Sequence, residues 1–437
     1  MLNDLKFNLG SVINSSVKKA AGKESYIERV LTKEIDIDTY LFLSETVESV
    51  DVSDRFIDVI KTFDVRKGIT PAGFRIEFTL EENSKLVIDL VRDISYGENG
   101  LKRPTNVIFS ADSANPYEIE PIKDLIGNLT CNPGIIYDLF INNPKANVDG
   151  KFKTRDEVMM EIGRILGPGC DISVELNNPY APIEELLEEA KHFRDMLSEY
   201  RVVIKVPHTG PMNFETINQL LVGDKTFATR YNQGKTEDFL RGHNVALRLQ
   251  QEGFRINFTL MFEPYQTALA LQAKPYFINS FVRHRLIQSN NIQAFLGSYE
   301  ASKNTNYLVQ LREYLVKNDH YPMSMKETDL LSVKDYAENL IKYRQFECEG
   351  ADGLDSVRHN LRVLKQCNLP DTRLIVCSME GPNNYPDLDR LLTEEEFKDM
   401  VGKVVITAEP NYLAQFTSTN QVVTYQRRFM NAAAGQK

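Results

Sequence analysis

A run of β-branched residues near the middle of the chain is interrupted by one lysine: Val202-Val203-Ile204-Lys205-Val206-Pro207-His208-Thr209-Gly210. Such a run, bounded by proline and glycine, is typical of a buried strand. A buried strand rarely contains lysine, because an ammonium group without a partner is costly to bury. Burial also lowers the pKa of a lysine, and the neutral amine is the form that attacks a carbonyl carbon. Lys205 therefore either reaches solvent from the strand end or acts as a nucleophile.

The sequence on both sides of this run alternates between short apolar stretches and helical patterns. The clearest helix covers 183–197, where apolar residues recur at helical spacing. Strands alternating with helices over this length predict a (β/α)8 TIM barrel. The predicted strands are Asn106–Ala111, Gly127–Cys131, Asp171–Leu176, Val202–Val206, Arg255–Phe262, Tyr276–Phe281, Leu374–Ser378 and Val404–Ala408. A doubly wound open sheet is the alternative, but no GxGxxG or GxxxxGK[ST] motif supports it.

The chain divides into an accessory region and the barrel. Residues 1–103 contain short strand patterns at 75–80 and 85–90 and predict a small N-terminal α/β domain. The charged, glycine-containing stretch 97–104 marks the boundary. We assign 104–417 to the barrel, with insertions near 223–242 and 287–350, and 418–437 to a C-terminal tail. Long insertions in compact domains often form lids or interface elements.

The composition of the chain limits which binding partners, cellular compartments and cofactors we expect. The net charge of -10 argues against a general nucleic-acid binder, which needs a basic face. The first residues lack a long apolar core, so we expect neither a signal peptide nor a membrane span. Five cysteines without CxxC spacing suit a reducing cytoplasm, and we expect no metal and no cofactor. Association into a homo-oligomer is left open.

Polar residues lie at or just beyond the carboxyl ends of the first five predicted strands. They are Asp112, Asn132, Glu175, Lys205, Asn257 and Thr259. The carboxyl ends of the strands in such a barrel meet at one mouth, so we expect these side chains to converge. An amine with two carboxylates is what Schiff-base aldol chemistry requires: the amine forms a carbinolamine and then an imine, while the carboxylates move protons.

The order of these residues resembles the transaldolase family of class I aldolases, over roughly residues 106–416. The family motif Thr-(Thr)-Asn-Pro-Ser is similar to Thr130-Cys131-Asn132-Pro133-Gly134. Its Ile-Lys-(Ile/Val)-Pro strand is matched by 204–207, and its Asn-x-Thr-Leu-x-Phe strand by 257–262. Its Ser-Pro-Phe-Val-Gly-Arg motif is matched loosely by 279–284.

The resemblance implies a barrel enzyme with Lys205 as the Schiff-base lysine and Asp112 as the proton-transferring carboxylate. It implies that Glu175 and Thr259 hold the catalytic water, while Asn132 and Asn257 hydrogen-bond the substrate and the intermediate. It also implies a substrate-binding role for Ser280, Phe281, Arg283, Arg285, Ser378 and Glu380. In the family, a phenylalanine at the place of Phe281 accompanies transfer of a ketol unit.

The chain departs from the family where a sugar phosphate is bound. The family uses an arginine after the sixth strand and another in a Ser-Phe-Arg motif on the seventh, where this chain has Ser378-Met379-Glu380. A carboxylate there repels phosphate. We therefore expect an atypical, sugar-like carbonyl substrate rather than a standard sugar phosphate. Lys225, Arg230 and Tyr231 form an alternative anion site.

Two other functions stay open on the same barrel. A lysine-dependent aldolase or lyase acting on a 2-oxo acid needs a cationic carboxylate site, for which Arg230, Arg283 and Arg285 are candidates. A non-catalytic barrel would instead bind or assemble through the N-terminal domain and the long insertion.

Overall fold

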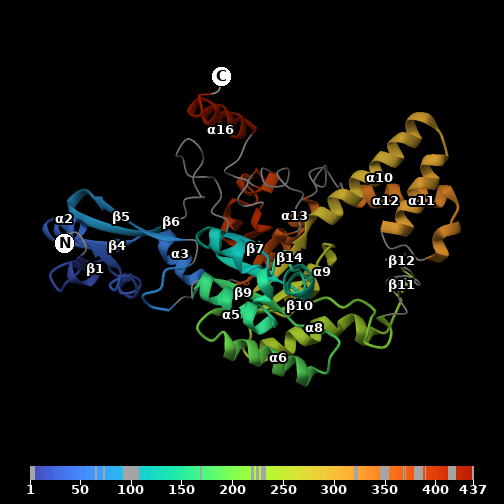
Figure 1. Cartoon of the computed structure of the whole chain (residues 1–437). Coiled ribbons are helices and arrows are strands. Elements are labelled where there is room, and N and C mark those ends of the chain that lie inside the picture. Colours follow the sequence, from blue (N-terminus) through green and yellow to red (C-terminus); the bar gives the residue numbers. More distant parts are fainter. Residues whose placement is uncertain are drawn as a thin grey trace.

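The computed structural model describes residues 5–63, 66–71, 74–91, 108–167, 170–217, 221–222, 226–227, 233–318, 323–344, 354–367, 369, 371–377, 387–388, 390–411 and 420–435. Figure 1 shows an N-terminal domain on one side, a central barrel, and an arm of three helices on the other side. The arm consists of α10 (Val282–Ser302), α11 (Asn306–Asn318) and α12 (Leu330–Arg344). No helix among the described residues is long and apolar enough to cross a membrane.

Eight parallel strands close into one barrel, in which the last strand pairs with the first. The strands are β7 (Ile108–Asp112), β8 (Asn128–Cys131), β9 (Asp171–Glu175), β10 (Arg201–Pro207), β13 (Ile256–Thr259), β14 (Phe277–Phe281), β15 (Arg373–Cys377) and β16 (Val404–Ala408). The TIM barrel is therefore confirmed, and the open-sheet alternative is excluded.

Helices cover the outside of the barrel. They include α4 (Pro116–Ile119), α5 (Arg155–Leu166), α6 (Ile183–Met196), α8 (Thr236–Gln251), α9 (Tyr265–Gln272) and α13 (Asp355–Gln366). Helix α5 begins with a capping box: Glu157 N donates to Thr154 Oγ1 at 3.2 Å, and Thr154 N donates to Glu157 Oε2 at 3.1 Å. Its apolar residues, such as Val158 and Ile162, are buried against the strands.

Side chains alternate between the two faces of each strand. Ile204 and Val206 belong to the main hydrophobic core between the strands and the surrounding helices. Val203 instead joins an apolar cluster inside the barrel. The period of two therefore directs Lys205 into the barrel and not toward the helices.

The N-terminal domain closes the end of the barrel at which the strands begin. Its four-stranded sheet has the order β2 (Lys18–Lys19), β4 (Ser49–Val52), β6 (Lys85–Val91) and β5 (Arg75–Glu81), accompanied by α1 (Glu24–Ile27), α2 (Ile37–Thr46) and α3 (Asp54–Phe63). A separate pair joins β1 (Lys6–Asn8) to β3 (Glu34–Asp36). One continuous apolar cluster contains Phe56 and Leu86 of this domain together with Ile108 and Phe277 of the barrel interior. The predicted strand patterns at 75–80 and 85–90 correspond to β5 and β6.

Three further parts of the described chain lie outside the barrel and the N-terminal domain. The hydrophobic core of the three-helix arm is formed by Ile292, Leu308, Leu311, Leu315, Val333 and Ala337. The short strands β11 (Leu221–Val222) and β12 (Thr226–Phe227) pair with each other. Helix α16 (Asn420–Ala433) is exposed along its length and stands apart from the barrel in Figure 1.

Helix α8 approaches strand β10 closely, and this contact gives a stability prediction. A Cβ atom at Gly242 would lie 2.3 Å from the carbonyl oxygen of Pro207. We expect Gly242→Ala to lower the free energy of unfolding by about 1–3 kcal/mol in urea denaturation, because the backbone must move to relieve the clash.

Gly297→Ala in α10 is the matched control, since a Cβ there meets nothing within 4 Å. It should be neutral or stabilising, by up to about 1 kcal/mol, because alanine favours a helix over glycine. Equal effects of the two substitutions would contradict the importance of the α8–β10 contact.

Candidate active site

Lys205 lies inside the barrel near the carboxyl ends of the strands and is paired with a carboxylate. It is only 6% exposed, and its Nζ atom lies 3.2 Å from Glu175 Oε2. The strand register sets Lys205 level with Glu175 on β9 and Asn257 on β13. Lys205 is therefore a buried, partnered amine, and the alternative of a strand-end lysine reaching solvent is wrong.

A layer of polar side chains surrounds this pair. Asn257 Nδ2 donates to Ser173 Oγ at 3.1 Å, and Asn279 Nδ2 donates to Asn257 Oδ1 at 2.6 Å. On the other side of the barrel, Asn128 Nδ2 donates to Ser110 Oγ at 2.7 Å. These hydrogen bonds hold Asn257 in a fixed orientation beside Lys205.

Several polar atoms near the carboxyl ends of the strands are buried without a hydrogen-bond partner among the described residues. They are Asp112 Oδ1, Thr259 Oγ1 and Thr407 Oγ1, and a fourth such atom, Asn128 Oδ1, lies deeper in the barrel at the start of β8. Leaving such atoms unpaired costs free energy, and in native proteins they usually bond water or a ligand. Two of the four, Asp112 and Thr259, belong to the predicted catalytic set.

The electrostatics of the site differ from the simple expectation for a buried lysine. Burial does lower the pKa of Lys205, but the carboxylates of Glu175 and Asp112 raise it by more, so the pKa is raised overall. The expected lowered pKa is therefore wrong for the site without substrate. Burial raises the pKa of Asp112, although Lys205 opposes that shift. A carboxyl group with a raised pKa is better able to deliver a proton.

Two predicted residues lie on the mouth side of the strands. Asn132 follows β8 and precedes a π-helical turn, Gly134–Ile141, and its Oδ1 accepts from Ile135 N at 3.0 Å. Phe281 ends β14, and its ring packs against Phe262 with centroids 4.7 Å apart.

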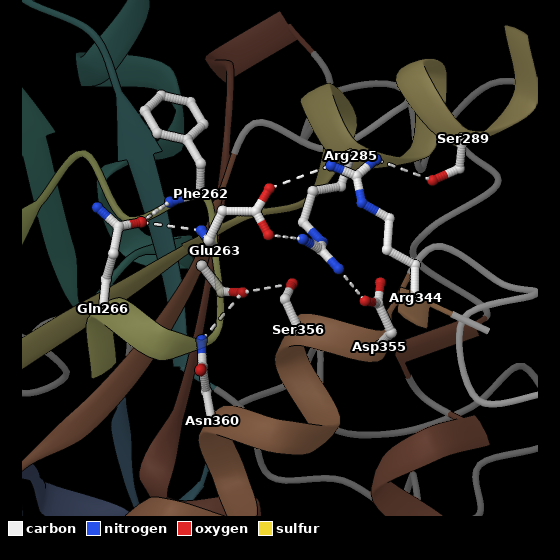
Figure 2. Close-up of polar contacts among 10 residues, drawn as sticks. Phe262, Glu263, Gln266, Arg285, Ser289, Arg344, Asp355, Ser356 and Asn360 are labelled. Carbon is white, nitrogen blue, oxygen red and sulfur yellow. Dashed lines mark hydrogen bonds and ion pairs between the residues drawn. The ribbon is translucent and has the colours of Figure 1, made fainter. Parts of the chain in front are cut away.

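The structure separates Ser280 from the polar interior. Ser280 Oγ lies 3.2 Å from Ser356 Oγ and accepts from Asn360 Nδ2 at 3.4 Å, so it bonds helix α13 outside the barrel. Figure 2 shows Ser356 and Asn360 on that helix. Its neighbour Asn279 faces inward instead. Alternation along β14 could have revealed this, since residues two apart, such as Asn279 and Phe281, share a face. By the same reasoning Ser173 joins the site, where it accepts a hydrogen bond from Asn257, although the sequence prediction missed it. Asn128 also faces inward, but it lies at the start of β8, level with Asp171.

The two arginines after β14 have different surroundings. Arg283 is exposed. Arg285 is 1% exposed and forms ion pairs with Glu263 and Asp355. Figure 2 shows Glu263 between Arg285 and Arg344, and Arg344 Nη2 lies 3.1 Å from Glu263 Oε1. The structure therefore uses Arg285 at the root of the three-helix arm, where it is already neutralised and is not held ready for a substrate anion.

Other predicted positions lie outside the described residues. These are Ser378 and Glu380, and also Lys225, Arg230 and Tyr231 of the alternative anion site. Their roles stay predictions.

A cavity of about 540 Å³ opens beside Asp112. It is lined by three carboxylates (Asp112, Glu118 and Glu409), by the amides Asn115, Asn143 and Asn411, and by apolar side chains such as Leu139 and Phe140. No lysine or arginine is among its described lining residues. A cavity of this kind disfavours a phosphate group and suits hydroxyl or amino groups.

The model of one protein family, described as transaldolase/fructose-6-phosphate aldolase, matches residues 109–435. The chain belongs to this family. The match includes all eight barrel strands except Ile108, the first residue of β7, and it confirms the resemblance seen in the motifs around Lys205. No curated protein matches the chain.

Two solved structures that match this family member are distant in sequence. The carboxyl transferase domain of Rhizobium etli pyruvate carboxylase is 10% identical over 58% of this chain and 47% of that chain, with a TM-score of 0.27. The match therefore spans less than half of that chain. Aldose reductase from Giardia lamblia is 13% identical over 60% of this chain and 93% of that chain, with a TM-score of 0.23. Neither likeness carries an argument about function.

A half-buried histidine after β10, His208, gives a pH prediction. Burial, with a smaller contribution from His243, lowers the pKa of His208 from 6.5 to about 4. The folded state therefore binds fewer protons than the unfolded state between these values. The contribution of neutral His208 to the unfolding free energy is fully present above pH 6.5, the pKa in the unfolded state. It is lost as the pH falls toward about 4, the pKa in the folded state. We expect His208 to remove about 2 kcal/mol of unfolding free energy between about pH 7.5 and about pH 5.

The measurement is urea denaturation of wild type and His208→Phe at both pH values. The unfolding free energy of His208→Phe should decrease less than that of wild type as the pH falls. The surface substitution His192→Gln should leave this decrease as large as in wild type. An unchanged decrease in His208→Phe would exclude His208 as its source.

The ion-pair cluster at the root of the arm gives a second prediction. Arg285→Met removes the positive charge that neutralises the carboxylates of Glu263 and Asp355 in a largely buried site. We therefore expect a loss of about 3–5 kcal/mol in unfolding free energy. The control is Arg164→Met, which removes an exposed i,i+3 pair with Glu161 and should cost less than about 1 kcal/mol. Similar losses in the two variants would count against a structural role of the cluster.

Proposed function

We propose that this family member is a Schiff-base enzyme that transfers or cleaves a carbon unit of a sugar-like ketone or ketose. The observation that carries the proposal is the buried amine of Lys205, 3.2 Å from Glu175, inside the polar end of a closed barrel. Membership of the transaldolase/fructose-6-phosphate aldolase family supports the same chemistry.

The first stage of the reaction makes the imine. Lys205 must lose a proton before it attacks, because its pKa is raised in the free site. Glu175, which is already within ion-pair distance, accepts that proton. The neutral amine adds to the substrate carbonyl carbon and gives a carbinolamine. Departure of its hydroxyl as water then leaves the imine. We propose that Glu175 and Thr259 hold the water that carries these protons.

The second stage breaks the carbon–carbon bond. The protonated imine withdraws the bonding electrons and becomes an enamine, while the substrate hydroxyl on the departing carbon loses its proton and becomes an aldehyde. Asp112, on the first strand of the barrel, takes that proton. Asn257 and Asn132 hydrogen-bond the substrate. The enamine then attacks a second aldehyde in a transfer reaction, or is protonated and hydrolysed in a cleavage reaction.

We propose that the substrate lacks the phosphate group of ordinary sugar-phosphate transaldolases. The cavity that adjoins the site at Asp112 supports this: Lys205 is not among its described lining residues, but its titratable lining residues, Asp112, Glu118 and Glu409, are all acidic. The pairing of Arg285 with two carboxylates supports it too. The same pairing removes Arg285 as the cation that a 2-oxo-acid aldolase needs for the substrate carboxylate, which leaves Arg283 and Arg230 as candidates for that alternative.

We also propose that the enzyme works in a reducing compartment such as the cytoplasm. The cysteines of the described residues, Cys131, Cys170, Cys367 and Cys377, are all free thiols. A protein from an oxidising compartment would more often pair them. Homo-oligomer formation stays a prediction.

Borohydride trapping tests the imine. The protein is incubated in turn with dihydroxyacetone, fructose 6-phosphate and pyruvate, then reduced and weighed by mass spectrometry. We expect an adduct with dihydroxyacetone that is absent from Lys205→Ala and present in Lys191→Ala, which removes an exposed lysine on α6. Glu175→Gln and Asp112→Asn should slow adduct formation or turnover by about 100- to 10,000-fold, since each removes a group that moves protons.

Three outcomes would contradict parts of the proposal. An adduct that persists in Lys205→Ala refutes the site assignment. The absence of an adduct with every carbonyl compound favours the non-catalytic alternative. An adduct formed with fructose 6-phosphate and not with dihydroxyacetone refutes the proposed lack of phosphate.

A further inference from the structure

A second large cavity lies at the opposite end of the barrel from the Lys205 amine. Its volume is about 510 Å³. Its walls come from segments that precede β13, β14 and β15 and from Arg201, the first residue of β10. Lys61 of helix α3 also lines it, so the cavity lies where the N-terminal domain meets the barrel.

The charges around this cavity are mostly positive. Its described lining residues include four basic ones, Lys61, Arg201, Arg255 and Lys274, against one acidic residue, Asp371. Helices α8 and α9 end here, at Gln251 and Gln272, and each contributes only a partial negative charge. Although Arg201 is paired with Asp171, the described lining holds more basic than acidic side chains, so the cavity favours an anion.

Arg201 supplies the most specific indication of a ligand. It is 6% exposed, its Nε donates to Asp171 Oδ1 at 2.8 Å, and its Nη2 donates to the Tyr276 hydroxyl at 3.0 Å. Its Nη1 is buried and has no hydrogen-bond partner within the part of the chain that the structure describes. The Tyr276 hydroxyl also accepts from Arg373 Nη1 at 2.8 Å and donates to Asp171 Oδ2 at 3.3 Å. The nearby acid is therefore already engaged, and a buried guanidinium donor is left over.

We propose that this cavity is an anion site for a phosphate group, either inorganic phosphate or a small phosphate monoester. Arginine and lysine together suit the several oxygens of a phosphate. The volume exceeds that of the ion alone and leaves room for a small organic part beside Tyr276 and Phe254. A bound phosphate would contact Lys61 and the barrel at once, and would therefore stabilise the junction between the two domains. This site is separate from Lys205 and does not depend on the proposed reaction.

Binding of inorganic phosphate to the full chain tests the site. Calorimetry in a phosphate-free buffer, at an ionic strength kept constant with chloride, gives the Kd for wild type and variants. We expect Lys274→Glu and Lys61→Glu each to raise the Kd at least 10-fold. Lys191→Glu makes the same change of charge on exposed α6 and should leave the Kd unchanged, as should Lys205→Ala. Amide hydrogen exchange should also slow in α3 when phosphate is added to wild type.

Three results would overturn the proposal. Wild type that does not bind phosphate at about 10 mM has no such site, since binding weaker than this corresponds to less than about 3 kcal/mol of binding free energy. Equal binding in Lys274→Glu, Lys61→Glu and Lys191→Glu would reveal a general effect of charge. Loss of binding in Lys205→Ala would place the phosphate in the active site. None of these results bears on whether Lys205 forms an imine, because trapping measures that separately.

Discussion

The ion pair between Lys205 and Glu175 is the interaction on which the upper half of the barrel depends. A lysine 6% exposed could not stay charged there without a carboxylate beside it. Once the pair is inside, the neighbouring strands must supply polar partners as well. The barrel does so with a ring of amides and hydroxyls that includes Asn257, Asn279 and Ser173. Its lower half combines apolar side chains, which merge with the core of the N-terminal domain, with the buried ion pair of Arg201 and Asp171 at the starts of β10 and β9.

The sequence was sufficient for the barrel and for the prediction that Lys205, Glu175 and Asp112 lie together, while their catalytic roles stay predictions. Strand ends and a period of two identify Lys205, Glu175 and Asp112 as neighbours, because parallel strands in a closed barrel leave few other arrangements. The assignment of Ser280 followed a loose motif match instead of this alternation, and the structure turns that side chain toward α13. At β14, the alternation of side chains along the strand was therefore a better guide to the orientation of Ser280 than the similarity to the family motif.

Features that depend on distant residues could not be read from the sequence. Arg285 looked like an anion ligand because nothing nearby in the chain signals Asp355, which lies 70 residues away. The raised pKa of Lys205 likewise depends on carboxylates from two other strands, whose distances only the fold sets. The basic cavity at the base of the barrel joins α3 to three loops, and no stretch of sequence contains more than a fragment of it.

The pairing of β16 with β7 has a consequence for synthesis on the ribosome. Val405 pairs with Ile108, so the residues that close the barrel are separated by 405 − 108 = 297 positions. The barrel cannot close until nearly the whole chain has emerged, whereas the N-terminal domain is complete much earlier. Its apolar core is then available to cover Ile108 and the strands that follow while they wait for the last one. The domain that forms the base of the finished barrel can thus act during translation as the surface on which the barrel is assembled.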